Sequence, residues 1–118
     1  MRWILVVSAF FLYHSTFAAD LPLTCPQALP TNDPNFCASF KSVAICHCMD
    51  SGLPASQCKS MDKIYRLMID RFGSIQKACA WQHHTTTQIC IDDWECFRSG
   101  GLDSQGRQCS DTGKACNN

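Results

Sequence analysis

The chain has 118 residues, with ten Lys and Arg against ten Asp and Glu, so its formal net charge is zero. A neutral chain offers no basic field, which argues against nucleic acid as a partner. Ten cysteines in so short a chain are typical of an exported, disulfide-stabilised domain and unusual for a cytosolic enzyme.

The N-terminus has the order of a secretory signal peptide. Arg2 precedes the apolar run 3–13, and small residues at Thr16 and Ala18 favour cleavage after Ala18. The apolar run is about half as long as the roughly 20 residues that a spanning helix needs. We therefore predict a signal peptide at 1–18, one disulfide-stapled domain at 19–118, a secreted or periplasmic location and no membrane span after cleavage.

Prolines dominate residues 19–34, which predicts an extended arm. Asp33 is a candidate N-cap, with Pro34 at the first position of a helix that ends at 50–52. Four apolar side chains share one face of that helix: Phe36, Phe40, Val43 and Ala44.

The middle of the chain predicts two consecutive helices. Ser60 can cap a helix from Met61 to Phe72, which Gly73 ends, and Ser74 can begin a shorter helix to Trp81. The first of these helices has an apolar stripe formed by Met61, Ile64, Tyr65, Met68, Ile69 and Phe72.

A last helix is expected after the loop 83–87. Asp92, with Glu95 three residues later, resembles a capping box, and the helix should end at 100–101. The polar tail that follows has few apolar residues, so we expect Cys109 and Cys116 to order it. The fold is predicted to be all-α: a small disulfide-rich helical bundle with an extended N-terminal arm and an irregular C-terminal tail.

The cysteines predict five disulfides and no free thiol, but about 945 pairings are open to ten cysteines. If the first helix and residues 61–81 pair in antiparallel fashion, Cys46 or Cys48 lies near Cys58, and Cys37 lies near Cys79. The ten disulfide cysteines are Cys25, Cys37, Cys46, Cys48, Cys58, Cys79, Cys90, Cys96, Cys109 and Cys116.

The segment Cys46-His47-Cys48 raises the question of a metal or redox site. A zinc site there would also use Cys58, with or without His83 or His84, but Cys46 and Cys48 are separated by one residue and point in different directions on a helix, which does not fit the usual spacing of zinc ligands. No Cys-x-x-Cys pair is present for redox chemistry. We predict that the segment staples the fold, with no metal and no cofactor, and that His47 is a half-buried packing residue.

The stretch CMDSGLPASQC, residues 48–58, resembles a segment of the TrbM/KikA-like proteins of bacterial conjugation. The matching positions are Cys48, Ser51, Gly52, Ser56 and Cys58, and the helix that follows is also similar. Cys46 has no clear counterpart, Cys37 lies farther from Cys48 than the family pattern has it, and nothing after Trp81 resembles the family. The resemblance implies an exported, non-catalytic accessory of a type IV secretion system.

Other residues are candidates for binding. Lys59, Lys63 and Arg66 share a helix face that could hold an anionic lipid headgroup, although Asp62 and Asp70 can neutralise it. Trp81 and Trp94, with Phe97, could form a partner-binding patch or simply complete the core.

Catalysis has little support in the sequence. His83 and His84 could act as a general base, but no nucleophile stands at a motif spacing from them, so we expect exposed loop histidines. We predict no catalytic residue and no enzyme. The leading hypothesis is an exported binding protein whose partner belongs to a secretion apparatus. The alternatives are an effector or toxin that binds anionic lipid or a target-cell protein, and a small secreted hydrolase.

Overall fold

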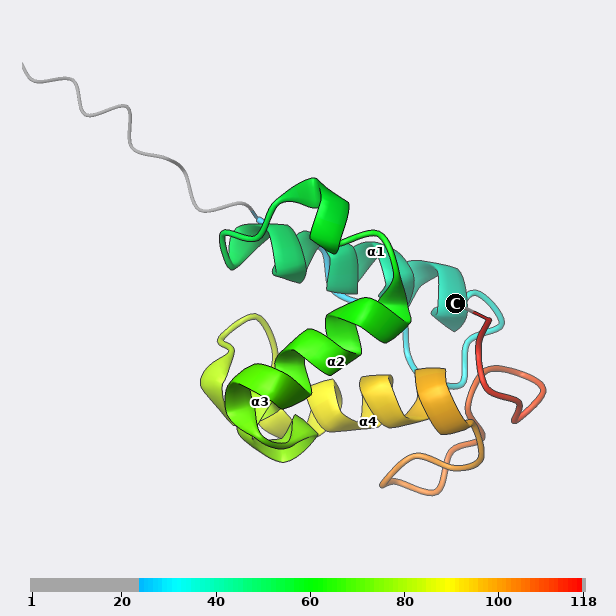
Figure 1. Ribbon diagram of the computed structural model, residues 1–118. Coiled ribbons are helices and arrows are strands. Elements are labelled where there is room, and N and C mark those ends of the chain that lie inside the picture. The colour runs from blue at the N-terminus through cyan, green and yellow to red at the C-terminus, as the bar shows by residue number, and fades with distance from the viewer. Residues whose placement is uncertain (1–23, 118) are drawn as a thin grey trace, which may run out of the picture.

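The computed structural model describes residues 24–117, and over this range the chain is helical (Figure 1). The described part contains no β-strand, only an isolated bridge between Leu102 and Gln108. The predicted all-α class is therefore confirmed. The elements are α1 (Phe36–Asp50), the 3-10 turn η1 (Ala55–Gln57), α2 (Met61–Phe72), α3 (Ile75–Trp81) and α4 (Thr87–Ser99).

The core forms where α1 packs in antiparallel fashion against α4. Phe40 contacts Trp94 and Phe97 across this interface, with ring centroids 5.0 and 5.7 Å apart. Near the C-terminal end of α1, the ring of His47 stacks on that of His84, which lies in the loop just before α4. The predicted apolar face of the first helix is confirmed, because Phe36, Phe40, Val43 and Ala44 are all buried.

The start of α1 differs from the prediction. The helix begins at Phe36, and Asn35 occupies the N-cap position without a side-chain capping bond. Asp33 instead accepts a hydrogen bond from the backbone N–H of Asn35, at 2.8 Å. Asp33 therefore stabilises the turn that leads into the helix, because its side chain reaches the N–H two residues ahead.

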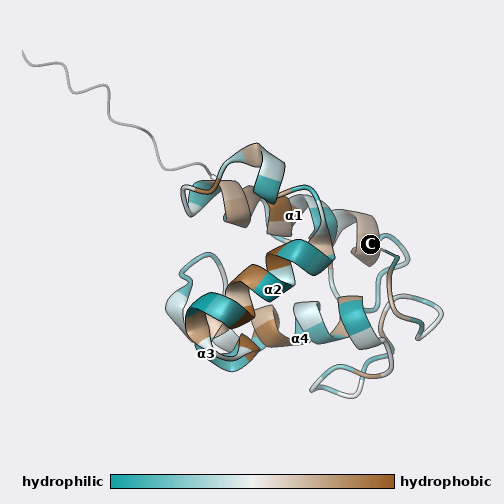
Figure 2. Cartoon of the chain, in the orientation of Figure 1, coloured by the Kyte–Doolittle hydropathy of each residue, from teal (hydrophilic) through white to brown (hydrophobic). Residues whose placement is uncertain are grey.

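The predicted helices α2 and α3 are confirmed with their boundaries. The hydroxyls of Ser60 and Ser74 each accept a hydrogen bond from the N–H three residues later, as N-caps do. Between the helices, Gly73 adopts φ +87°, a left-handed conformation that ends α2 at little steric cost. Figure 2 shows apolar and polar residues on different faces of α2.

The expected antiparallel pairing of α1 with α2 is wrong. The segment 51–60, which contains η1, turns back over α1, and α2 then runs away from α1 toward α3 (Figure 1). The disulfide Cys48–Cys58 ties this returning segment to the end of α1. Of the two cysteines predicted to lie near Cys58, Cys46 and Cys48, it is Cys48 that bonds to it. Because the return is made before α2 starts, α4 and not α2 becomes the antiparallel neighbour of α1.

The predicted start of the last helix is also wrong. α4 begins at Thr87, and the Thr86 hydroxyl caps it by accepting the N–H of Ile89 at 3.2 Å. Asp92 and Asp93 are buried inside the helix. Asp92 does not act as an N-cap because its carboxylate accepts hydrogen bonds from Gln88 and from Ser104 of the tail.

All ten cysteines form disulfides, which confirms the predicted count of five bridges. The predicted proximity of Cys37 and Cys79 is wrong, because Cys37 bonds to Cys116 and Cys79 bonds to Cys90. The pairs are Cys25–Cys46, Cys37–Cys116, Cys48–Cys58, Cys79–Cys90 and Cys96–Cys109.

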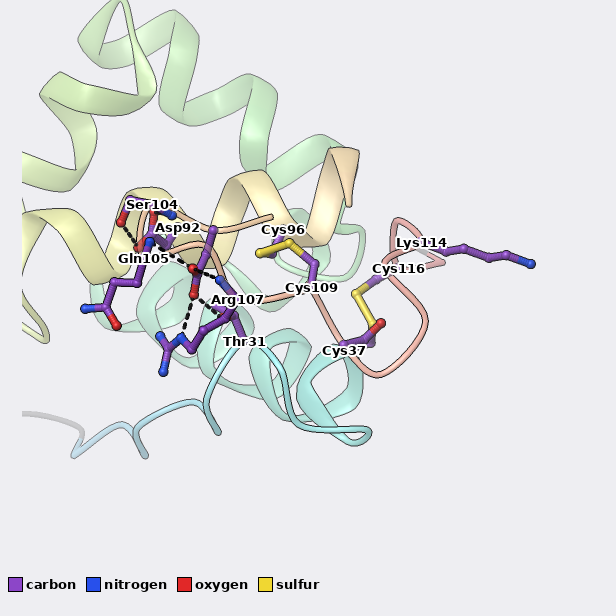
Figure 3. The surroundings of a disulfide bond; sticks show 12 residues. Thr31, Cys37, Asp92, Cys96, Ser104, Gln105, Arg107, Cys109, Lys114 and Cys116 are labelled. Carbon is purple, nitrogen blue, oxygen red and sulfur yellow. Dashed lines mark hydrogen bonds and ion pairs between the residues drawn. A yellow bond between two sulfur atoms is a disulfide. The ribbon is translucent and has the colours of Figure 1, made fainter. Parts of the chain in front are cut away.

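The C-terminal tail is held by two disulfides and by buried hydrogen bonds (Figure 3). Asp103 accepts from the Thr31 hydroxyl at 2.6 Å and from Nε of Arg107 at 2.8 Å, which joins the N-terminal arm to the tail. The tail passes close to the backbone of Gly100, which has φ +67°. A Cβ at this position would lie 2.6 Å from the backbone oxygen of Gly113, so the close approach requires glycine. The tail therefore depends on polar contacts as well as on Cys109 and Cys116.

No helix in the described range is long and apolar enough to cross a bilayer. The predicted signal peptide, 1–18, lies outside the described residues.

Candidate functional site: a cleft with a stacked histidine pair

A cleft of about 880 Å³ opens between the end of α1, the inner face of α2, α3 and the loop before α4. This volume is in the range of small-molecule sites, roughly 300–1,000 Å³. Its apolar wall includes Leu53, Ile64, Leu67, Met68, Phe72 and Trp81. Its polar and charged groups include His47, Asp50, Asp70, Arg71, Gln82 and His84.

The apolar wall is carried mainly by α2 and α3. The C-terminal half of the predicted α2 stripe is only half-buried, and its Met68 and Phe72 line the cleft. The ring of Phe72 lies 5.2 Å from that of Trp81, centroid to centroid, at the rim. Trp81 is 59% exposed, which is unusual for a tryptophan in a small domain and leaves its ring available to a ligand.

A pair of histidines lies at the polar side of the cleft. The rings of His47 and His84 are stacked, with centroids 4.0 Å apart and planes within 13°. Nε2 of His84 lies 3.2 Å from Oδ2 of Asp50. Nε2 of His47 is the one buried side-chain nitrogen or oxygen without a hydrogen-bond partner among residues 24–117.

The environment of His47 favours a neutral imidazole. Burial and, to a lesser degree, the neighbouring His84 together lower the pKa of His47 to about 4, while Asp50 opposes the shift. His47 therefore keeps a free lone pair at physiological pH. Since the folded-state pKa lies below the usual 6.5, this group contributes stability above pH 6.5 that is lost as the pH falls toward 4.

Gln82 organises the loop that presents His84. Its Oε1 accepts the backbone N–H of His84 at 2.9 Å and that of Thr85 at 3.1 Å. Its Nε2 donates to the carbonyls of Cys79 and Thr85. From the N-terminal arm, Gln27 Nε2 donates to the carbonyl of His84 at 2.7 Å. The backbone of His84 is thus fixed from two sides.

The cleft offers few groups for nucleophilic chemistry. Its cysteines are oxidised in disulfides, so they supply no thiolate. The hydroxyl of Ser51 lines the cleft but donates to the backbone carbonyl of Cys48 at 2.5 Å, and this proton is not directed to a histidine.

The structure confirms the predicted exposure of His83 and half-burial of His47 but not the predicted exposure of His84. His83 is exposed, as expected, but the expectation of an exposed His84 is wrong, because His84 packs between His47, Asp50 and the arm. His47 is half-buried, as predicted, although it packs against another imidazole. Gln82 and Asp50 were missed. Nothing in their spacing pointed to the cleft, since the α1–α4 pairing that assembles it was not predicted.

The predicted lipid-binding residues lie elsewhere. Lys59, Lys63 and Arg66 are exposed and do not line the cleft. Arg66 forms an ion pair with Asp62 at 2.7 Å, as the i,i+4 spacing predicted. Both predicted tryptophans line the cleft, but Trp94 is buried in the core, whereas Trp81 is exposed at the rim.

Asp93, outside the cleft, is a buried carboxyl with an unusual titration. Burial raises its pKa to about 7, and the negative charge of Asp92 acts in the same direction, against Arg107. Because the folded-state pKa exceeds the unfolded value near 3.8, the native state binds the proton more tightly. The group therefore stabilises the fold at low pH, and this stability is lost as the pH rises through 7.

We expect Asp93→Asn to be more stable than the parent by about 1–3 kcal/mol at pH 8 and to differ little near pH 4. Urea unfolding of both proteins between pH 4 and pH 8 measures the difference in their free energies of unfolding. His47 is present in both proteins, so its own pH-dependent contribution cancels in this difference. Asp111→Asn, at an exposed position, is the control and should follow the parent. Parallel curves for parent and Asp93→Asn would contradict the raised pKa.

The chain was compared with known proteins. No family model matches it, and neither a curated protein nor a solved structure matches it.

Proposed function

We propose that this chain is an exported, non-enzymatic binding protein whose cleft holds the apolar body of a ligand and places a polar group of that ligand beside His47 and His84. The observation that carries the proposal is the cleft of about 880 Å³, walled by aliphatic and aromatic side chains and polar at one side. Sites that combine an apolar wall with a few convergent polar groups are typical of small-molecule binding.

Binding accounts for the cleft better than catalysis does. Acyl transfer needs a nucleophile within reach of a base, but Ser51 donates to a backbone carbonyl and the cysteines are oxidised. The exposed Trp81 and the half-buried Phe72 and Met68 have a use in binding, because burying them under a ligand removes apolar area from water.

Export and a place in a secretion apparatus are parts of the proposal with separate support. Five disulfides in a small domain are compatible with an oxidising compartment. Membership of a conjugation apparatus is supported by the resemblance of residues 48–58 to the TrbM/KikA-like proteins alone. Conjugation genes next to this one would strengthen it.

The experiment is a titration of the oxidised protein with the apolar fluorescent probe N-phenyl-1-naphthylamine. We expect saturable binding that Trp81→Ala and Leu67→Gln each weaken by about tenfold, since removing one large apolar contact costs on the order of 1–2 kcal/mol. Trp81 is at the rim and Leu67 is half-buried, so both variants should keep their fold, which circular dichroism checks.

Ile89→Gln is the matched control, because Ile89 is exposed on α4 and does not line the cleft. Its probe affinity should equal that of the parent. Equal losses in all three variants, or none in the two cleft variants, would refute the proposed site.

A further inference from the structure

The stack of His47 on His84 is an arrangement that suits one charged ring but not two. The ring centroids lie 4.0 Å apart and the planes are within 13° of parallel, so the faces of the two rings are in contact. Two imidazolium rings at this distance repel each other, and the repulsion is stronger in a partly buried site than in bulk water. A second proton on the pair therefore acts against the stack.

His47 is the ring that has no place for a charge. A charged imidazole carries an N–H on both nitrogens. At His84, the Nε2 atom lies 3.2 Å from Oδ2 of Asp50, so an N–H there has an acceptor. Nε2 of His47 is buried without a hydrogen-bond partner among residues 24–117, and a charged N–H left without acceptor or water is costly. Protonation of His47 therefore favours a conformation in which its Nε2 reaches water.

The stack is also part of the wall of the cleft. His47 comes from α1 and His84 from the loop before α4, and both line the polar side of the cleft. For Nε2 of His47 to reach water, the two rings must part, and the polar side of the cleft must rearrange with them. A ligand that packs against the closed stack loses this wall when the rings part.

We propose that acidification releases a ligand from the cleft, because a proton on His47 separates its ring from that of His84. This proposal rests on the proposed function, since it requires a ligand in the cleft. The stacked pair then acts as a switch: the closed arrangement holds the ligand while His47 is neutral, and the open arrangement releases it when His47 is charged.

The direction of the switch follows from the titration of His47. Burial and the neighbouring His84 lower the pKa of His47 to about 4 in the closed stack, against 6.5 for a histidine in water. The closed arrangement is therefore fully favoured above pH 6.5 and is disfavoured progressively as the pH falls toward 4. This difference in pKa lets protonation change the ratio of closed to open molecules by at most about 300-fold.

Other charged and titratable groups of the cleft are less suited to this role. From the arm, α3 and α4, the described lining contains no titratable side chain, because its cysteines are in disulfides. Asp70, Arg71 and His83 line the cleft but are exposed, so water screens their charges. Asp50 is the one competitor, since its carboxylate lies beside His84 and also loses its charge in acid.

The test is titration of the oxidised protein with N-phenyl-1-naphthylamine at pH 7 and at pH 4. We expect binding to be at least about tenfold weaker at pH 4, with the helical circular dichroism signal retained. His47→Phe keeps a flat ring against His84 but takes no proton, so its affinity should be the same at both pH values. In the parent, the NMR signal of the His47 ring should titrate with the same midpoint as the loss of binding, a measurement that does not require the variant to fold.

Two further variants separate His47 from its neighbours. Asp50→Asn should still bind the probe at pH 7 and should lose it at a lower pH than the parent, because the charge of Asp50 favours the proton on His47. Weak binding of Asp50→Asn already at pH 7 would instead assign the switch to Asp50 and overturn the proposal. His83→Gln is the matched control and should follow the parent.

The outcomes distinguish this proposal from the proposed function. If the parent binds no probe at pH 7, the proposed function fails and the switch fails with it. If the parent binds equally well at pH 7 and pH 4, or if His47→Phe loses the probe at pH 4 as the parent does, only the switch is overturned.

Discussion

Replacing Cys37 and Cys116 together by alanine should lower the free energy of unfolding by about 4 kcal/mol, with the other four disulfides intact. The two cysteines are 79 positions apart, and this bridge closes the longest loop of the five. The three short bridges inside the loop reduce its effective length to roughly 50 residues, which gives this value in the chain-entropy model. Urea unfolding under non-reducing conditions measures the loss.

The matched control removes Cys25 and Cys46, which are also half-buried and lie 21 positions apart. The cavity left behind is then similar, and the loss should be smaller by about 1 kcal/mol because the loop is shorter. A larger loss for Cys25 and Cys46 would show that contacts of the arm matter more than loop closure. A small domain is stabilised by only about 5–15 kcal/mol in total. If the loss of the Cys37–Cys116 bridge takes away a substantial part of that stability, the domain needs this bridge to fold.

The sequence predicts those parts of the fold that depend on nearby residues. Ser60 and Ser74 cap their helices, and Gly73 separates them, because each acts within about one helical turn. The face of α1 was also predictable, since burial follows the 3.6-residue period. The start of α4 was not, because Asp92 and Glu95 imitate a capping box while Asp92 bonds to Ser104 of the tail.

The helix partners could not be read from the sequence because several packings satisfy the same apolar faces. Pairing α1 with the next helix was the simplest choice, but η1 and the bridge Cys48–Cys58 return the chain before α2 begins. A pairing of α1 with α2 alone does not bring His47 close to His84, so the sequence does not predict the histidine pair. The histidine pair follows from the antiparallel contact of α1 with α4, and the cleft also needs α2 and α3, which carry most of its apolar wall.

The same contact makes Phe40 the side chain whose truncation should damage the core most. Phe40 is 3% exposed and touches three rings: Phe36, stacked at 5.6 Å between centroids, the edge-on Trp94, and Phe97. We expect Phe40→Ala to lower the free energy of unfolding by about 3–5 kcal/mol, through lost burial and the cavity left between the helices. Unfolding in urea, followed by tryptophan fluorescence, measures the loss.

Two further variants separate the causes. Phe40→Leu keeps most of the volume but removes the ring contacts, so it should cost about 1–2 kcal/mol. Leu102→Ala, at a side chain that is 68% exposed, should change stability by less than about 0.5 kcal/mol. If Phe40→Ala costs no more than Leu102→Ala, the α1–α4 interface is not the centre of the core. The assembly of His47 and His84 would then need another explanation, since Phe40 packs against Trp94, whose side chain forms part of the cleft wall.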